Sequence, residues 1–358
     1  MTVKTAVVVG AGIVGACLAY RLARAGLHVT ILDAGQAHNK ASGASWAWLN
    51  AASARDKPYY DLRKAGVAAY HDLEQELSGR LKIDWSGALV WDPDLYTPKA
   101  GGHPQKDWGG TMKIVNADEI RILEPLLTSP PQGALYSAED GLVDGAHATQ
   151  TVIESAQAIG AHCAFGRRVQ SLLHQDDRII GVQTNYGTLQ ADVTILAAGT
   201  GNPDLLAAFD IALPTAHKAG LLITTAPISK RLTRALWTDT VHVKQLSDGR
   251  LVIGEYDHGP GGLDDPEATI ARMIEITQKM MPALGVLSVE RTTIATRPIP
   301  GDGYPVIGAI PSLPGAYIAM MHSGFTLAAV TAQLLSQEIL GGNESPLLAP
   351  YRLSRFVQ

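Results

Sequence analysis

Cysteine is scarce in this sequence, with two residues, Cys17 and Cys163, in a chain of 358. They stand far apart, and neither belongs to a close cysteine pair or to a Cys/His spacing typical of metal sites. The sequence therefore predicts neither a disulfide framework nor a metal centre. Both cysteines lie in apolar stretches, so we predict reduced, buried thiols in a cytoplasmic protein.

An excess of positive charge is also lacking, because 29 Lys and Arg stand against 34 Asp and Glu, for a net charge of -5. This balance argues against nucleic acid or an anionic membrane as a partner. No apolar run is long enough for a transmembrane segment, and we interpret the apolar stretch after Lys4 as a strand rather than a signal peptide. With 46% hydrophobic residues, the chain can bury two cores, so two packed domains are predicted.

Glycine is regularly placed near the N-terminus, where Gly10, Gly12 and Gly15 form a Gly-x-Gly-x-x-Gly pattern. A β-branched run precedes it, and an apolar helix and a second apolar strand follow, which predicts a βαβ unit. Gly10 allows a tight turn, Gly12 lets a pyrophosphate approach the backbone, and Gly15 lets helix and strand pack closely. Asp33 ends the second strand 18 residues after Gly15, where a carboxylate can bind ribose hydroxyls. The unit predicts dinucleotide binding, and an acid at this position favours FAD or NAD over NADP.

The rest of the chain reads as alternating helices and strands. Helices are predicted at 57–79, 117–125, 146–160, 266–281 and 322–340. Strands are predicted at 83–91, 169–173, 179–182, 189–201, 220–225, 240–244, 250–254 and 316–320. The strand at 189–201 ends in small residues, as a buried parallel strand facing a nucleotide would. The Pro- and Gly-rich segment 93–110 marks departure from the first domain, and 216–294 is a second sheet-bearing region inserted into it.

Several ordered motifs resemble those of the FAD-dependent amine and amino-acid oxidoreductases, a family that includes glycine oxidase, D-amino-acid oxidase and monomeric sarcosine oxidase. They are the N-terminal glycine turn, the small-residue loop 40–49, the strand end 196–199, the segment 297–308 and the helix start at 322–324. The resemblance implies an α/β fold, with a Rossmann-type FAD-binding domain and an inserted α+β substrate domain on a mixed or antiparallel sheet. The implied FAD-binding domain comprises 1–83, 141–215 and 295–358, and the implied substrate domain comprises 84–140 and 216–294.

The resemblance also implies FAD-binding positions. They are Gly10, Gly12, Ile13, Val14, Gly15, Asp33, Ala34, Ala41, Ser42, Ser45, Trp46, Ala47, Val169, Ala198, Gly199, His322, Ser323, Gly324, Phe325, Thr326 and Leu327. The alternative is that the 40–49 loop merely enters a helix with its tryptophans in the core, and that the last helix is an ordinary capped helix. Some relatives attach flavin through a cysteine or a histidine. This chain has Ala295 and Ala47 at the corresponding positions, so the FAD is predicted to be non-covalent.

Three residues are matched to substrate contacts. Arg297 corresponds to the arginine that binds the substrate carboxylate in glycine oxidase-like members, and a guanidinium can pair a carboxylate through two bonds. His242 falls near a substrate-contacting tyrosine of glycine oxidase, and Trp48 lies where the loop would meet the cavity. A surface ion pair, a strand histidine and a core tryptophan are the respective alternatives.

The resemblance implies oxidation of the Cα–N bond of a small amino acid, whether a D-amino acid, glycine or an N-substituted amino acid. Hydride would pass to flavin N5, and the imine would hydrolyse to an oxo acid. No residue is assigned as a catalytic acid or base. The electron acceptor is left open between oxygen and a quinone or partner protein, and a homo-oligomer is compatible with the sequence. Other open alternatives are a dehydrogenase subunit that oxidises opines or amines, a NAD-linked protein and a non-catalytic dinucleotide-binding protein.

Overall fold

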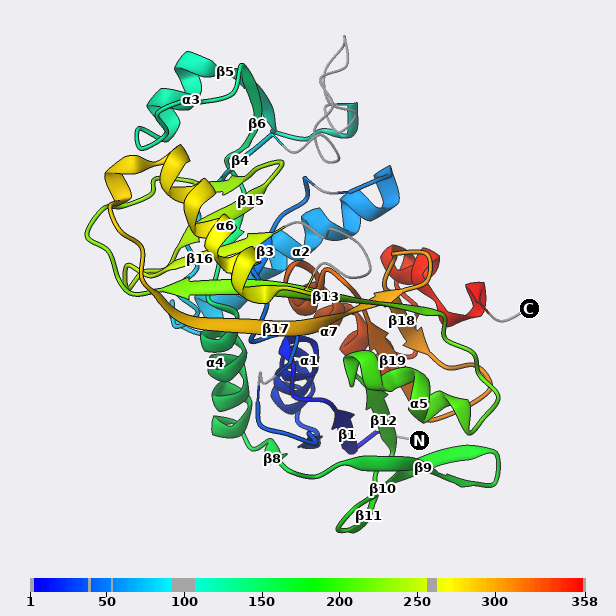
Figure 1. Ribbon diagram of the computed structural model, residues 1–358. Helices are drawn as coiled ribbons and strands as arrows, with labels where there is room; N and C mark the ends of the chain where they lie inside the picture. The colour runs from blue at the N-terminus through cyan, green and yellow to red at the C-terminus, as the bar shows by residue number, and fades with distance from the viewer. Residues whose placement is uncertain (1–2, 38–39, 53, 92–106, 256–262, 357–358) are drawn as a thin grey trace.

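The structure is a computed structural model that describes residues 3–37, 40–52, 54–91, 107–255 and 263–356. Most of the Pro- and Gly-rich segment 93–110 lies outside these ranges. Two large sheets and two small ones carry the fold (Figure 1). Within the described ranges, no helix combines the length and apolar character needed to cross a membrane. No group of three or more His, Cys, Asp or Glu side chains in the same ranges could hold a metal ion.

The first large sheet has six strands in the order β18-β19-β12-β1-β2-β8, parallel except for the β18–β19 pair. Its β-branched strand β1 sends alternate side chains to opposite faces. Ala6 and Val8 therefore join one apolar core, whereas Val7 and Val9 join another. The strands are β1 (Thr5–Val9), β2 (His28–Leu32), β8 (His162–Ala164), β12 (Val193–Leu196), β18 (Val306–Ala309) and β19 (Ala316–Met320).

Four helices build the core on the Ala6 and Val8 side. Helix α1 lies against β1 and β2, α4 and α7 flank α1, and α2 packs on α7 (Figure 1). A Cβ at Gly66 of α2 would lie 2.2 Å from the Thr326 carbonyl oxygen, so only glycine permits this close approach of α2 to α7. The helices are α1 (Ile13–Arg24), α2 (Lys57–Glu76), α4 (Gly145–Ala158) and α7 (Gly324–Gly341).

The opposite face of the parallel sheet packs against an antiparallel sheet of three strands and a short helix. These are β9 (Val169–Gln175), β10 (Arg178–Thr184), β11 (Gly187–Gln190) and α5 (Asn202–Ala207). The single strand predicted at 189–201 is wrong, because β11 and β12 belong to different sheets and 199–201 is a 3-10 turn. Asp192 lies at the break and accepts bonds from the Lys4 and Thr5 N–H groups at 2.8 and 2.9 Å, which redirects the chain beside β1.

The second large sheet has eight strands in the order β17-β13-β16-β15-β14-β4-β6-β5, antiparallel except for the β14–β4 pair. Its strands are β4 (Ala88–Val90), β5 (Lys113–Asn116), β6 (Gly133–Ser137), β13 (Thr215–Thr225), β14 (Ala235–Trp237), β15 (Val241–Gln245), β16 (Leu251–Glu255) and β17 (Val289–Pro300). Helix α6 (Pro266–Met280) packs on β15 and β16, and α3 (Ala117–Leu123) contacts β5 and β6. The predicted fold class, a parallel nucleotide-binding-type sheet with a second mixed sheet, is confirmed.

The long strands β13 and β17 run across the middle of the molecule to the side of β18 and β19 (Figure 1). The sequence analysis assigned no strand to residues 295–300, but they form the second half of β17. The predicted domain limits at 215 and 294 fall in β13 and β17, and the division into two domains stays a prediction. The strand predicted at 83–91 shortens to 88–90, because only Asp84 of the earlier residues pairs, through a bridge to Leu142.

The remaining elements are short. A two-stranded sheet pairs β3 (Trp48–Leu49) with β7 (Gly141–Leu142), and 3-10 turns occur at 282–284, 346–351 and 353–355. Both cysteines are free thiols, as predicted. Cys17 is buried in α1, but Cys163 on the edge strand β8 is only half-buried, because no further strand covers it.

Candidate active site

The glycine turn joins β1 to α1. Gly10 has a φ of +110°, and a Cβ there would lie 2.4 Å from the Ala197 carbonyl oxygen at the end of β12. A Cβ at Gly15 would lie 1.9 Å from the Gly10 carbonyl oxygen. These two glycines therefore let the helix start directly on the ends of two central strands.

The start of α1 is open to an anion. Gly12 caps the helix without a side-chain hydrogen bond, and the first turn contains no acidic residue. A Cβ at Gly12 would find only the Ser42 hydroxyl nearby, at 3.0 Å, and this hydroxyl accepts a bond from the Ile13 N–H at 3.0 Å. The positive end of the helix dipole and a hydroxyl group thus meet at one accessible point, which suits a pyrophosphate.

Asp33 is fixed beside this turn. One carboxylate oxygen accepts a bond from the Ala11 N–H and the other from the Gly35 N–H, both at 2.8 Å. A carboxylate has about four acceptor positions, so capacity remains for ribose hydroxyls. The Arg167 N–H donates to the Asp33 carbonyl at 2.8 Å, which brings the chain leading to Val169 up to the end of β2.

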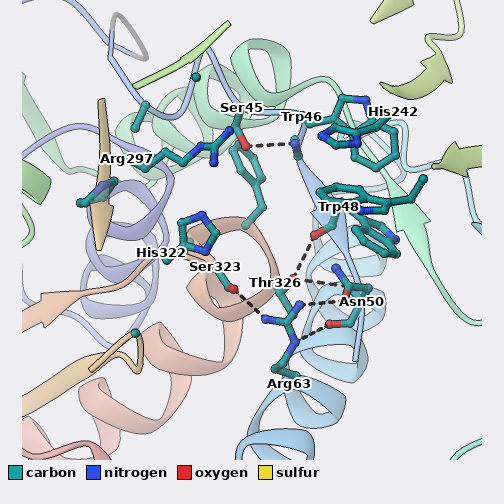
Figure 2. Close-up of a pocket in the computed structure, with 18 of the residues that line it drawn as sticks. Ser45, Trp46, Trp48, Asn50, Arg63, His242, Arg297, His322, Ser323 and Thr326 are labelled. Carbon is teal, nitrogen blue, oxygen red and sulfur yellow. Dashed lines mark hydrogen bonds between the residues drawn. The ribbon is translucent and has the colours of Figure 1, made fainter. Parts of the chain in front are cut away.

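A cavity of about 870 Å³ lies near the nucleotide turn and between the two large sheets. Twelve of the predicted site residues line it: Ala41, Ser45, Trp46, Ala47, Trp48, His242, Arg297, His322, Ser323, Gly324, Phe325 and Thr326. Figure 2 shows Arg297 and His322 on one side of it and Trp46, Trp48 and His242 on the other. The other predicted residues do not line this cavity: Gly10, Gly12, Ile13, Val14, Gly15, Asp33, Ala34, Ser42, Val169, Ala198, Gly199 and Leu327.

The first side of the cavity is cationic. Arg297 extends from β17 across Gly220 of β13, where a Cβ would lie 2.7 Å from its guanidinium. No ion pair or hydrogen bond joins the Arg297 side chain to any residue in the described ranges. The His322 side chain is exposed to the cavity, and the protein that surrounds it, together with the charge of Arg297, lowers its pKa to about 4. The imidazole is therefore neutral at physiological pH.

A hydrogen-bond network forms the base of the cavity. Buried Arg63 of α2 donates to the Ser323 hydroxyl at 2.6 Å, and to the carbonyl and side-chain oxygens of Asn50 at 3.0 and 2.7 Å (Figure 2). The Thr326 hydroxyl of α7 donates to the Trp48 carbonyl at 2.9 Å. These bonds fix the start of α7 against α2 and the strand that carries Trp48.

The opposite side is aromatic. The rings of Trp237 and His242 stack with centroids 3.7 Å apart, and Trp48 stacks on Trp237 at 4.9 Å. Trp46 meets all three rings edge-on at 5.3–5.8 Å. The Trp48 N–H donates to the Asp140 carboxylate at 2.8 Å, and burial raises the pKa of Asp140 to about 7. Each ring is thus held by its neighbours, so this side is a rigid apolar wall.

Lys244 of β15 lies behind the aromatic wall with 1% of its surface exposed. Its ammonium donates to the Val143 and Ala47 carbonyls at 2.6 and 3.4 Å and lies 5.7 Å from the centre of the Trp46 ring. Lys244 thereby ties the second sheet to the 41–47 loop. Burial lowers its pKa from 10.5 to about 7, although the Asp144 carboxylate opposes the shift.

This burial predicts a stability that rises with pH. Between about 7 and 10.5 the unfolded chain keeps the Lys244 proton that the native chain has lost, so the free energy of unfolding increases with pH over that interval. Urea unfolding at several pH values within this window measures the slope. In Lys244→Met the slope should be smaller, and equal slopes in the two proteins would contradict the assigned environment.

The sequence analysis did not single out Arg55, Arg63, Trp237, Tyr304 or Glu255, all of which line the cavity. Tyr304 lies in the motif segment 297–308, and the other four belong to none of the motifs. The one available signal was Arg63, a charged residue on the face of α2 that is otherwise apolar and buried. Trp237 and Glu255 come to the cavity from β14 and β16 of the second sheet, whereas Arg55 and Tyr304 come from the segments that precede α2 and β18.

Comparison with known proteins places the chain among flavoenzymes. The family profile described as DAO, FAD dependent oxidoreductase, matches residues 5–338. Glycine oxidase from Bacillus licheniformis is 26% identical over 345 residues, covering 94% of this chain and 92% of the relative. The uncharacterized oxidoreductase YurR from Bacillus subtilis (strain 168) is 27% identical over 370 residues, covering 97% of this chain and 98% of the relative.

Solved structures show the same fold. Glycine oxidase from Geobacillus kaustophilus matches with a TM-score of 0.87 and 22% identity, over 99% of this chain and 100% of that one. L-proline dehydrogenase from P.horikoshii matches with a TM-score of 0.84 and 22% identity, over 99% and 98% of the two chains.

These findings decide the cofactor. The sequence pattern had left FAD and NAD open, and the family profile selects FAD. The open start of α1, the space at Gly12 and the carboxylate of Asp33 fit the pyrophosphate and ribose of this cofactor. The chain belongs to the DAO family of FAD-dependent oxidoreductases.

Proposed function

We propose that this enzyme oxidises the Cα–N bond of a small amino acid and releases an imine that water converts to an oxo acid. The observation that carries the proposal is the guanidinium of Arg297, which has no hydrogen-bond or ion-pair partner among the described residues and faces a cavity bordered by the 41–47 loop and the start of α7. Glycine oxidases from Bacillus licheniformis and Pseudomonas aeruginosa, each 26% identical to this chain, support an amino acid as the substrate.

Arg297 orients the substrate in this proposal. Its guanidinium donates two parallel bonds to the α-carboxylate, which holds the Cα–H bond in one direction. The bound flavin supplies the acceptor for the hydride that leaves Cα. The positive charges of Arg297 and Arg63 disfavour an ammonium group nearby, so the substrate amine binds in its neutral form and its lone pair assists the departure of hydride. No side chain is required as a general base.

The start of α7 stabilises negative charge at this end of the cavity. Ser323, Gly324 and Phe325 line the cavity, and the first turn of α7 contains no acidic residue. The Ser323 hydroxyl accepts the bond from Arg63 and makes no cap bond to the helix backbone, so the positive end of the dipole faces the cavity. His242 and Trp48, on the aromatic wall, bound the space left for the substrate side chain.

We propose that the FAD is held without a covalent bond. Alanine occupies both positions at which relatives attach flavin, since Ala47 and Ala295 line the cavity and offer no nucleophile. Acid precipitation of the purified protein is expected to release all yellow colour into the supernatant. Flavin that remains in the washed precipitate would contradict the proposal.

The visible spectrum of the anaerobic holoenzyme tests the function. Bleaching of the flavin bands by glycine, sarcosine, a D- or L-amino acid or an opine would establish both the reaction and the substrate class. Flavin that stays oxidised with every amino acid would refute amino-acid oxidation. Oxygen consumption during turnover then distinguishes an oxidase from a dehydrogenase that passes electrons to a quinone or partner protein.

A further inference from the structure

Four cations surround His322. The charges of Arg297, Arg63, Arg55 and Lys218 all act on its imidazole, and the three arginines line the cavity. Arg55 precedes α2 and lies against the turn after β17, where a Cβ at Gly303 would be 3.2 Å from its guanidinium. The cationic side therefore extends from β17 past His322 to this turn.

Among the described residues, the arginines of this cluster have no acidic hydrogen-bond partner. Arg63 donates only to neutral oxygens, those of Asn50, Tyr59 and Ser323. No carboxylate or other acceptor in the described ranges binds the side chain of Arg297 or Arg55.

The nearby acidic side chains already form hydrogen bonds or ion pairs with other residues. Asp56, next to Arg55 in the chain, accepts bonds from the Tyr304 hydroxyl and the Tyr59 N–H. Glu255 is the one acid among the described residues that line the cavity, and it pairs with Arg272 of α6. Among the described residues, therefore, no carboxylate is hydrogen-bonded to the guanidinium of Arg297 or Arg55.

Like charges gathered in a partly enclosed cavity repel one another, and a bound anion relieves this repulsion. In the proposed function, one substrate carboxylate pairs with Arg297. Beside a neutral substrate tail, Arg55 would have no hydrogen-bonded carboxylate within the described residues. We infer that the substrate carries a second carboxylate, which Arg55 binds at the outer end of the cationic side.

This inference rests on the proposed function and specifies its substrate as an amino dicarboxylate. The second acid can belong to the side chain, as in glutamate, or to the nitrogen substituent, as in iminodiacetate. In glutamate both carboxylates are on the carbon chain, whereas in iminodiacetate each is on one of the two carbons bonded to nitrogen. Both classes present two carboxylates to the guanidiniums of Arg297 and Arg55, which line the cavity together with His322.

Anaerobic flavin reduction with matched substrate pairs tests the inference. The pairs are glutamate against glutamine, in both D and L forms, and iminodiacetate against sarcosine. We expect the second-order rate constant for flavin reduction by the dicarboxylate to exceed that for its partner at least about 10-fold in one pair, because charge-assisted hydrogen bonds discriminate on that scale. The pair that responds identifies which position carries the second acid.

Arg55→Gln assigns the effect to Arg55. We expect the dicarboxylate preference to fall about 10- to 100-fold, with an intermediate value in Arg55→Lys. Arg121→Gln is the matched control, because Arg121 is exposed on α3 and pairs only with Asp118, and the preference should not change there.

Two results would overturn the inference while the proposed function stands. One is reduction of the flavin at equal efficiency by both members of each pair. The other is a dicarboxylate preference that survives Arg55→Gln unchanged. If no amino acid of either kind reduces the flavin, amino-acid oxidation itself is refuted, and the inference falls with it.

Discussion

Replacing Arg297 with alanine is expected to lower kcat/KM for carboxylate substrates by about 10²- to 10⁴-fold, mainly through KM. Two charge-assisted bonds, each worth about 1.5–3 kcal/mol, would be lost from the bound substrate. The side chain has no structural partner in the described ranges, so its removal breaks no ion pair of the fold. Steady-state kinetics, together with the flavin content of the purified variant, measures the effect.

Arg297→Lys is the informative control. Lysine keeps the positive charge but presents it as a point rather than a planar fork, so an intermediate KM is expected. Equal loss in both variants would mean that the two-bond geometry, rather than the charge, is essential. A KM for Arg297→Ala equal to that of the wild type would refute the role given to this residue.

Replacing Gly15 with alanine is expected to destabilise the protein by about 3 kcal/mol or more and to abolish FAD binding. The new Cβ would lie 1.9 Å from the Gly10 carbonyl oxygen, and both groups are backbone-anchored. Helix α1 would have to move away from β1, which would open the turn that receives the pyrophosphate. Thermal unfolding and the fluorescence of released flavin measure the two effects.

Alanine substitutions at two other glycines distinguish an effect on packing from an effect on cofactor contact. In Gly341→Ala the Cβ meets nothing within 4 Å at the end of α7, so neither stability nor flavin content should fall. In Gly12→Ala the Cβ meets only the Ser42 hydroxyl, at 3.0 Å, so the chain should fold but bind FAD weakly. Wild-type stability and full flavin content in Gly15→Ala would show that the close approach of helix and strand is not required.

The nucleotide turn was predictable because its information is local. Gly10, Gly12, Gly15 and Asp33 lie within one βαβ unit, and steric limits on the backbone tie each residue type to one position. The long amphipathic helices were also predicted within a few residues, since their apolar spacing depends on their own sequence.

Strand boundaries were less predictable. The apolar composition of 189–196 is continuous, yet β11 and β12 join different sheets because Asp192 pairs with N–H groups almost two hundred residues earlier in the chain. Similarly, β17 continues through 295–300 because β13 pairs along its whole length, a fact that no local pattern expresses. The residue composition of a segment predicts that it forms a strand, but the strand with which it pairs determines where it ends.

By itself, the sequence determined the type of protein: a dinucleotide turn and a parallel sheet around it, while the role of Arg297 stays a prediction. Only the tertiary structure decided which side chains line the cavity. Arg55 comes from the segment just before α2, Arg63 from α2, and Trp237 and Glu255 from β14 and β16. The physical reason is that backbone sterics and apolar spacing act between near neighbours in the chain. Charge balance and ring stacking act between groups in space, and they are set only when the two sheets pack.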